Sequence, residues 1–516
     1  MKKIILFISA LANIGLLNAQ PTIQWQKSFG GSVDDMAQSI QQTLDGGYIV
    51  GGYTQSNNGD VSGNKGNYDY WLIKLNAVGA IQWQKCLGGT GYDLAYSIQQ
   101  TSDSGYVVAG FSDSNNGDVT GNKGADDFWI VKLSSTGTIQ WEKTAGGTLY
   151  DDALFVQQTS DGGYIVCGDT QSNNGDVSGN NGSFDCWIVK LSSTGSIQWT
   201  KCLGGTSDDT AASLQQTKDG GYIITGSTLS NNGDVSGNNG NWDVWVVKLN
   251  SSGTLLWQKC LGGTGEDIGY SIKQTLDSGY VVAGFTKSNN GDVLGIHSVG
   301  VPDYWIVKLN TTGSIQWQKC LGGTGDDKAY SIIQTSDSGY VVTGYTKSNN
   351  GDVTGNNSVG LQDYWLVKLN SSGAIQWQKC LGGTNDDWAR SIKQTSDGGY
   401  VVAGWTKSIN GDVTLNNGMN DYWVVKLNPS VTNIKENPQL QWNLFPNPSS
   451  GIFNLTFDLP DNKRTLKIYN AVGQIIHESV IDKANASIDL SAQSSGIYFA
   501  FISNNGERSV KKIVIK

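Results

Sequence analysis

The chain has 516 residues, with 35 Lys and Arg against 45 Asp and Glu and a formal net charge of −10. A hydrophobic content of 38% excludes a disordered chain, and 68 glycines without a three-residue period exclude a collagen-like one. With two histidines, the chain offers few routes to histidine-based catalysis or a zinc site.

The N-terminus has the pattern of a targeting segment. Two lysines after Met1 precede an apolar run over residues 4–17, and the small residue Ala19 stands before Gln20. This predicts a signal peptide, residues 1–19, cut after Ala19. A membrane anchor is the alternative, but the run is shorter than the roughly 20 residues that a spanning helix needs. We expect a secreted chain without a transmembrane segment.

Seven copies of one unit fill residues 20–428. Each contains W-Q-K-C-L-G-G-T-G-x-D, S-D-G-G-Y-V-V-A-G, S-N-N-G-D-V-x-G-N and D-Y-W-x-V-K-L, with small variations. Four strand signals per unit are separated by turn residues. In the second unit the expected strands are Ile81–Leu87, Ala95–Thr101, Gly105–Phe111 and Phe128–Leu133. This pattern predicts an all-β chain with a seven-bladed β-propeller, four strands per blade.

The two ends of the repeat region complement each other. The strand Ile23–Phe29 precedes the first complete unit, and the last unit stops at Asp421–Leu427 without an outer strand of its own. We expect the N-terminal strand to close the last blade beside Asp421–Leu427, which leaves no open sheet edge. An open β-solenoid is the alternative, and it would not need this complementarity.

The repeated string K-L-N-S-S-G-x-I-Q-W-Q-K-C-L-G-G-T, together with S-G-Y-V-V-x-G-Y-T, resembles the bacterial β-propeller repeat family of secreted and surface proteins. The resemblance covers about residues 22–428. It implies the architecture but no activity, because that family has no common catalytic motif.

The composition changes at Pro429. Five of the seven prolines lie between residues 429 and 460, so we predict a linker at 429–441. Short alternating strands then predict a small Ig-like β-sandwich at 442–516.

The C-terminal segments Phe445-Pro446-Asn447-Pro448, Gly496-Ile497-Tyr498 and Lys512-Ile513-Val514 resemble the type A sorting domain of the type IX secretion system. The resemblance implies contact with that machinery and export to the medium or the outer surface of a Gram-negative bacterium. An ordinary Ig-like binding module is the alternative.

Acidic residues are expected to gather at one end of the propeller. Residues 20–428 carry 24 basic and 38 acidic side chains, a net charge of −14. If the strands alternate in direction, the long Asn-Gly-Asp loops and the Gly-Gly-Thr connections share one face, which holds most of the acids. Such a face repels nucleic acid and acidic polymers and favours cations or neutral ligands.

One Asp recurs in the long loop of every unit. Carboxylates in flexible, Gly-rich loops suit calcium, which makes a calcium site a hypothesis. The alternative is an architectural role in which the carboxylate binds backbone amides. The recurring residues are Asp60, Asp118, Asp176, Asp234, Asp292, Asp352 and Asp412.

Side chains that break the repeat are candidates for ligand binding. Trp242, Trp388 and Trp405 depart from it in or beside the loop-rich face, where aromatic rings could stack on sugars; ordinary loop packing is the alternative. Cys167 and Cys186 also depart from it, on strands that should neighbour, so a disulfide between them is expected outside the cell.

These patterns favour a secreted or surface-attached protein that binds a ligand, either a glycan or a protein, or acts in adhesion. A propeller enzyme that acts on glycans as a hydrolase or lyase is the second hypothesis, and a structural surface component is the third. We assign no catalytic residue, because no unit carries a distinctive Ser/His/Asp set or Cys/His pair.

Overall fold

The computed structural model describes residues 20–357, 360–429, 442–457, 463–470, 474–504 and 507–516. The predicted signal peptide and most of the predicted linker lie outside these residues. Contacts divide the chain into two compact units, Met1–Ser430 and Val431–Lys516. Among the described residues, no helix is long and apolar enough to cross a membrane.

The larger unit is built of four kinds of strand, each repeated seven times. The innermost strands are β2 (Asp35–Gln42), β6 (Asp93–Gln100), β10 (Asp151–Gln158), β14 (Ser213–Gln216), β18 (Asp267–Gln274), β22 (Asp327–Gln334) and β26 (Asp387–Gln394). The second strands are β3 (Tyr48–Thr54), β7 (Tyr106–Ser112), β11 (Tyr164–Thr170), β15 (Tyr222–Thr228), β19 (Tyr280–Thr286), β23 (Tyr340–Thr346) and β27 (Tyr400–Thr406).

The third and outer strands complete each sheet. The third strands are β4 (Asp69–Leu75), β8 (Asp127–Leu133), β12 (Asp185–Leu191), β16 (Asp243–Leu249), β20 (Asp303–Leu309), β24 (Asp363–Leu369) and β28 (Asp421–Leu427). The outer strands are β1 (Ile23–Phe29), β5 (Ile81–Leu87), β9 (Ile139–Ala145), β13 (Ile197–Leu203), β17 (Leu255–Leu261), β21 (Ile315–Leu321) and β25 (Ile375–Leu381).

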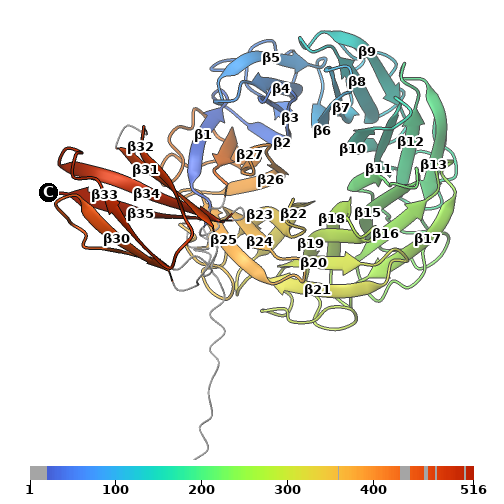
Figure 1. Cartoon of the computed structure of the whole chain (residues 1–516). Helices are drawn as coiled ribbons and strands as arrows, with labels where there is room; N and C mark the ends of the chain where they lie inside the picture. The colour runs from blue at the N-terminus through green and yellow to red at the C-terminus, as the bar shows by residue number, and fades with distance from the viewer. Residues whose placement is uncertain (1–19, 358–359, 430–441, 458–462, 471–473, 505–506) are drawn as a thin grey trace, which may run out of the picture. The chain divides into compact units, whose positions relative to one another are not determined.

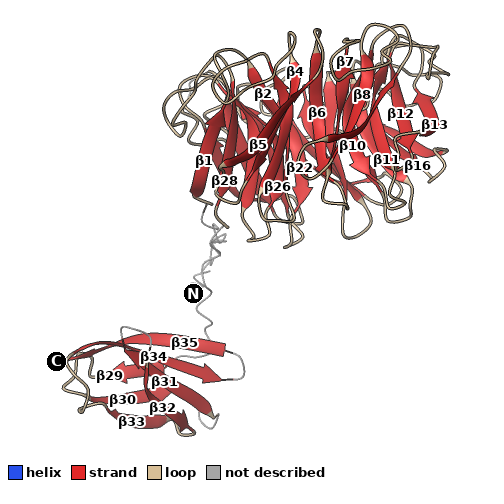
Figure 2. Ribbon diagram, turned by 90° about the horizontal axis from the view of Figure 1, so that it is seen from above, coloured by secondary structure: helices blue, strands red, loops and turns tan. Residues whose placement is uncertain are grey.

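These strands form seven four-stranded antiparallel sheets that resemble propeller blades. Six sheets use strands in chain order, and the seventh has the order β1-β28-β27-β26. Strand β1 pairs with β28 as the sequence predicted, with Ser28 opposite Trp423. Figure 1 shows the sheets around a common centre, and β2 contacts both β6 and β26. Figure 2 shows strands and loops alone in the described chain.

The repeated tryptophans form the packing between sheets. Third-strand Trp129 is fully buried and lies 4.5 Å from the ring of Tyr70 in the preceding sheet. The Tyr70 hydroxyl also donates a hydrogen bond of 2.9 Å to the carbonyl of Trp129. Because such pairs combine apolar burial with a satisfied polar atom, they fix the contact between neighbouring blades.

Each long inner strand carries a bulge that shapes the centre. In β26 the residue Arg390 has no partner on β27, because Ala389 pairs with Gly404 and Ser391 pairs with Ala403. A side chain at Gly404 would collide with the carbonyl oxygen of Trp388, so glycine is required opposite the bulge. The bulge therefore sets apart one residue in each of the six long inner strands, whereas the short strand β14 pairs with β15 without a bulge.

The smaller unit is a two-sheet β-sandwich. One sheet has the order β29-β30-β33 and the other β32-β31-β34-β35. Residues of both sheets, including Phe453 and Ile468, share one buried core. The strands are β29 (Trp442–Phe445), β30 (Ile452–Phe457), β31 (Arg464–Asn470), β32 (Ile475–Ile481), β33 (Asn485–Asp489), β34 (Gly496–Asn504) and β35 (Glu507–Ile515).

Candidate functional site

The short-turn end of the larger unit is the same in every blade. The Lys74 side chain is 5% exposed and pairs at 2.9 Å with Asp45. Burial alone would raise the pKa of Asp45, but hydrogen bonds from Thr43 and Lys74 outweigh it and lower this pKa to about 2. The equivalent pairs are Lys132–Asp103, Lys190–Asp161, Lys248–Asp219, Lys308–Asp277, Lys368–Asp337 and Lys426–Asp397.

The aspartate that opens each inner strand is architectural as well. Asp209 is fully buried. Its carboxylate accepts hydrogen bonds from the Thr228 and Ser230 hydroxyls and from the Gly205 amide. Buried carboxylates need such donors, so this repeated network holds the connection between blades.

The seven aspartates of the calcium hypothesis contact backbone amides. Asp118 accepts a hydrogen bond of 3.1 Å from the amide of Gly88 and forms an ion pair with Lys65. Among the described residues, no group of three or more His, Cys, Asp or Glu is arranged to hold a metal ion. Calcium binding stays a hypothesis beside the architectural alternative. The equivalents Asp60, Asp176, Asp234, Asp292, Asp352 and Asp412 each accept a hydrogen bond from the matching glycine amide.

The inner strands enclose a cavity of about 120 Å³, which we call the central cavity. Its wall includes the bulged residues Tyr96, Tyr270, Tyr330 and Arg390. A serine follows the bulged residue in six of the seven blades, and the third blade has Phe155 there.

A group of aromatic rings lies beside the central cavity on the fifth to seventh blades, and we call it the aromatic platform. Trp388 stacks on Trp405, with ring centres 5.1 Å apart and an angle of 23°. Trp405 is 7% exposed, whereas Trp388 is half-buried, so Trp388 offers the accessible ring. The platform consists of Tyr270, Phe285, Tyr330, Tyr345, Trp388 and Trp405.

Cations cover this platform. The Arg390 guanidinium lies 4.3 Å from the ring centre of Tyr330 and 5.1 Å from that of Trp388. The ammonium of Lys328 lies 4.5 Å from the ring centre of Phe285. Aromatic faces attract such cations, and the platform therefore presents both ring faces and positive charge.

Acidic side chains gather on the second to fourth blades, and we call them the acidic sector. Burial raises the pKa of Asp169 to about 8 despite a hydrogen bond from the Ala211 amide, and the charge of Asp152 adds to the effect. Burial and then the charge of Asp126 raise the pKa of Asp152 to about 7. Figure 1 places β10 and β11 across the centre from β26 and β27. The sector consists of Asp113, Asp126, Asp152, Asp169 and Asp208.

The structure separates the three candidate tryptophans. Trp388 and Trp405 lie together in the platform, whereas Trp242 lies in the loop before β16, half-buried. The backbone carbonyl of Trp242 accepts a hydrogen bond of 2.6 Å from the Asp267 amide. Tyr330 and Tyr345 do not stand out in the sequence, because Tyr96 and Tyr53 occupy matching positions in other units, whereas Arg390 and Lys328 do depart from their counterparts.

Cys167 and Cys186 are free, buried thiols in this structure, and a disulfide between them stays a prediction. They lie on the neighbouring strands β11 and β12, but Cys167 is opposite Ile188 and Cys186 is opposite Asp169. This places the thiols on a diagonal, which is wider than a directly opposite pair. Unreduced peptide mapping tests whether they join outside the cell.

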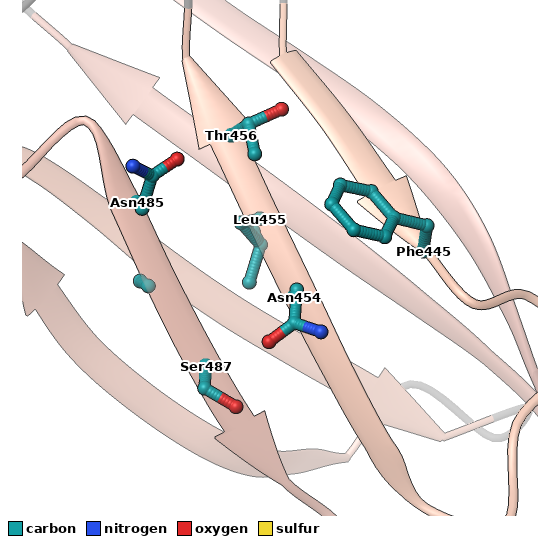
Figure 3. A pocket seen from close by; sticks show the side chains of 7 residues that line it. Phe445, Asn454, Leu455, Thr456, Asn485 and Ser487 are labelled. Carbon is teal, nitrogen blue, oxygen red and sulfur yellow. The ribbon is translucent and has the colours of Figure 1, made fainter.

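The sandwich carries a shallow groove of about 340 Å³ over β29, β30 and β33. Figure 3 shows Phe445 beside the strand that carries Asn454 and Thr456, with Asn485 on the next strand. Phe445 is 48% exposed. The groove holds no cluster of titratable residues.

Residues 443–516 match the model of the secretion system C-terminal sorting domain family. That domain marks proteins exported by the type IX secretion system to the cell surface or the extracellular space. The chain is therefore exported by this route, and its C-terminal domain interacts with the secretion machinery, as the sequence predicted.

Other comparisons find distant likenesses. The regulatory protein FlaEY of Caulobacter vibrioides is 22% identical over 432 residues, and the match covers 73% of this chain but only 43% of FlaEY. PorZ, a surface component of the type IX secretion system of Porphyromonas gingivalis, is 10% identical with a TM-score of 0.41, covering 95% of this chain and 60% of PorZ. A puromycin hydrolase is 10% identical with a TM-score of 0.43, covering 86% and 64%. These likenesses assign no activity.

Proposed function

We propose that this chain is a glycan-binding protein of the cell surface or medium. Its larger unit would be a closed seven-bladed β-propeller of the bacterial repeat family, joined through a linker at 429–441 to an Ig-like sorting domain. The glycan would bind over the aromatic platform. The observation that carries this proposal is the half-buried ring of Trp388, stacked on Trp405 and flanked by Tyr330 and Arg390.

The platform differs from the core packing of the same fold. The repeated third-strand tryptophans are buried, and Trp129 packs against Tyr70 of the preceding blade, whereas Trp388 keeps part of its ring accessible. Flat aromatic rings stack on the apolar faces of sugars, and neighbouring polar groups bind the hydroxyls. Arg390, Lys328 and the acidic sector supply such groups.

A glycan array probed with the full chain tests the proposal, with Trp388→Leu as the main variant. Leucine occupies the equivalent position Leu94 of the second blade, so this change keeps a side chain that the fold already accepts. We expect the variant to lose about tenfold or more in affinity, which corresponds to about 1.4 kcal/mol.

Trp242→Phe is the matched control, because the third blade carries Phe184 at that position. It should keep the wild-type affinity. If the wild-type chain retains no glycan, or if Trp388→Leu binds as well as Trp242→Phe, then glycan binding at the platform is wrong and a structural surface role becomes the better proposal.

An enzyme that acts on glycans is the second candidate, and the acidic sector favours it. Glycoside hydrolysis uses a carboxyl group with a raised pKa as the acid and a second carboxylate nearby. Asp152 and Asp169 lie directly opposite each other on β10 and β11, and both have raised pKa values. Release of shorter products from a retained glycan, abolished by Asp169→Asn, would favour this candidate over simple binding.

A further inference from the structure

At one inner-strand position beside the central cavity, the residue differs between blades in a way that packing does not explain. In the first four blades a glutamine of the inner strand accepts a hydrogen bond from a backbone amide of the next blade. Gln41 accepts one of 2.7 Å from Gln100, and Gln215 accepts one of 2.7 Å from Gln274. The fifth and seventh blades carry Lys273 and Lys393 at this position.

A lysine cannot replace the glutamine in this role. The ammonium group has three donors and no acceptor, so Lys273 and Lys393 cannot accept the inter-blade hydrogen bond. Both instead line the central cavity together with Arg390. Two blades have thus exchanged a structural acceptor for a positive charge at the centre of the unit.

The positive charges in this cavity are uncompensated. Among the described residues that line it, three are cationic and none is acidic. No carboxylate acts on the pKa of either lysine; burial lowers both values, and the charge of Lys393 further lowers that of Lys273, to about 7. The ammonium of Lys273 lies 5.2 Å from the ring centre of Phe155. Half-buried cations that lie close together without a counter-charge are unfavourable.

The remaining wall supplies neutral donors. The hydroxyl oxygens of Ser213, Ser271 and Ser331 each accept a backbone amide of the next blade at 3.3 to 3.4 Å. A hydroxyl that accepts through its oxygen keeps its own hydrogen for donation. The volume of about 120 Å³ has room for several water molecules or one small ion.

We propose that the central cavity binds one small inorganic oxyanion, phosphate or sulfate, between Lys273, Lys393 and Arg390. The anion neutralises these cations and accepts hydrogen bonds from the serine hydroxyls. The site shares Arg390 and Tyr330 with the aromatic platform, but neither Trp388 nor Trp405 lines the cavity. Variants of Lys273 and Lys393 and variants of Trp388 therefore test the two proposals separately.

Titration calorimetry and thermal melting of the full chain test the site, with sodium phosphate and sodium sulfate compared with sodium chloride at equal ionic strength. We expect one anion per chain and a melting temperature that rises with its concentration. The two titrations separate phosphate from sulfate as the preferred ion.

The double variant Lys273→Gln/Lys393→Gln restores the residue of the first four blades, which favours correct folding. We expect it to bind the anion at least tenfold more weakly and, in chloride, to melt at a higher temperature than the wild type. Lys259→Gln, on the outer strand β17, removes a charge outside the cavity and should change neither property.

Three results would overturn the proposal. They are a wild-type chain that binds neither phosphate nor sulfate saturably, a double variant that binds as tightly as the wild type, and binding of acetate alone, which would assign the cavity to a carboxylate. Equal weakening by Lys259→Gln would show that general charge attraction, rather than the cavity, holds the ion.

Discussion

The seven blades carry the same side chains at the short-turn end and different side chains around the loop-rich centre. At the short-turn end all seven blades repeat one buried lysine paired with one aspartate. Around the loop-rich centre, the matching positions vary between blades. The seventh blade has Trp388, Arg390 and Trp405, whereas the third has Asp152, Leu154 and Asp169. The fold therefore depends on the lysine–aspartate pairs, whereas the variable residues around the centre are free to bind a ligand.

The freedom at the centre has a physical origin. A bulge sets one residue of each long inner strand apart from the ladder, and the glycine opposite keeps that geometry constant. Because the hydrogen bonds of the sheet do not depend on the bulged side chain, Arg390 and Tyr330 can occupy equivalent positions. The side chains at the bulge thus vary while the backbone around them stays the same, which is the arrangement expected of a binding scaffold.

The largest expected difference in stability between the two regions comes from removing a core tryptophan. Trp365 is fully buried, and its ring centre lies 4.5 Å from that of Tyr304. We expect Trp365→Ala to lower the free energy of unfolding by about 3–5 kcal/mol, because it leaves a large cavity. Trp388→Leu should cost less than half as much, since its ring is partly in solvent. Denaturant unfolding followed by circular dichroism measures both, and equal losses would make the platform part of the core.

Buried carboxylates give the second contrast. Asp209→Ala leaves two hydroxyls and an amide without their acceptor, so we expect a loss of about 3 kcal/mol. Asp169→Asn replaces a buried carboxyl group whose ionisation is opposed by Asp152 and Asp208, and it should leave stability unchanged or higher. The same unfolding experiment measures both variants. A large loss for Asp169→Asn would mean that this carboxylate is structural.

The pH dependence of stability separates the two ends. Asp152 and Asp169 have folded pKa values of about 7 and about 8, above the usual 3.8. The folded chain therefore binds more protons than the unfolded chain, and the contribution of these groups to stability is lost as the pH rises from about 4 to about 8. Asp45 and Asp103 have pKa values lowered to about 2, so their contribution is lost as the pH falls from about 4 to about 2.

We accordingly expect the melting temperature to be highest in mild acid and to decline on both sides. The double variant Asp152→Asn/Asp169→Asn should make the melting temperature fall less steeply between pH 5 and pH 8. Other buried aspartates, such as Asp69 with a pKa of about 7, account for the rest of the fall. Asp103→Asn serves as the control: because it removes the partner of buried Lys132, it should lower the melting temperature throughout and flatten only the acid side of the profile. A double variant with the wild-type profile would contradict the raised pKa values.

The repeat spacing was sufficient to predict most of the strands. Expected Ile81–Leu87 and Phe128–Leu133 agree with β5 and β8 to within one residue, because glycine-rich turns mark their ends. The pairing of β1 with β28 also followed from a missing strand. The bulge did not follow, since it depends on register between two strands and leaves no mark in a single repeat.

The candidate site was predictable in part. Trp388 and Trp405 stood out because they break the repeat, but so do Arg390, Lys273 and Lys393, whose position at the centre becomes visible only when the inner strands are assembled. Trp242 broke the repeat equally well and lies apart from the platform. Departure from a repeat therefore identifies variable positions, and the fold decides which of them meet.

The smallest expected effect concerns the aspartates of the long loops. Asp118 already accepts the Gly88 amide and pairs with Lys65, so its carboxylate is occupied without a metal ion. Because exposed ion pairs contribute little, we expect Asp118→Asn to lower the free energy of unfolding by less than about 1 kcal/mol. We also expect calcium and chelator to give equal melting temperatures for the wild type. If calcium raises the melting temperature and Asp118→Asn reduces this rise, then the long loops bind calcium. They would then belong, like the residues around the centre, to the ligand-binding parts of a constant backbone.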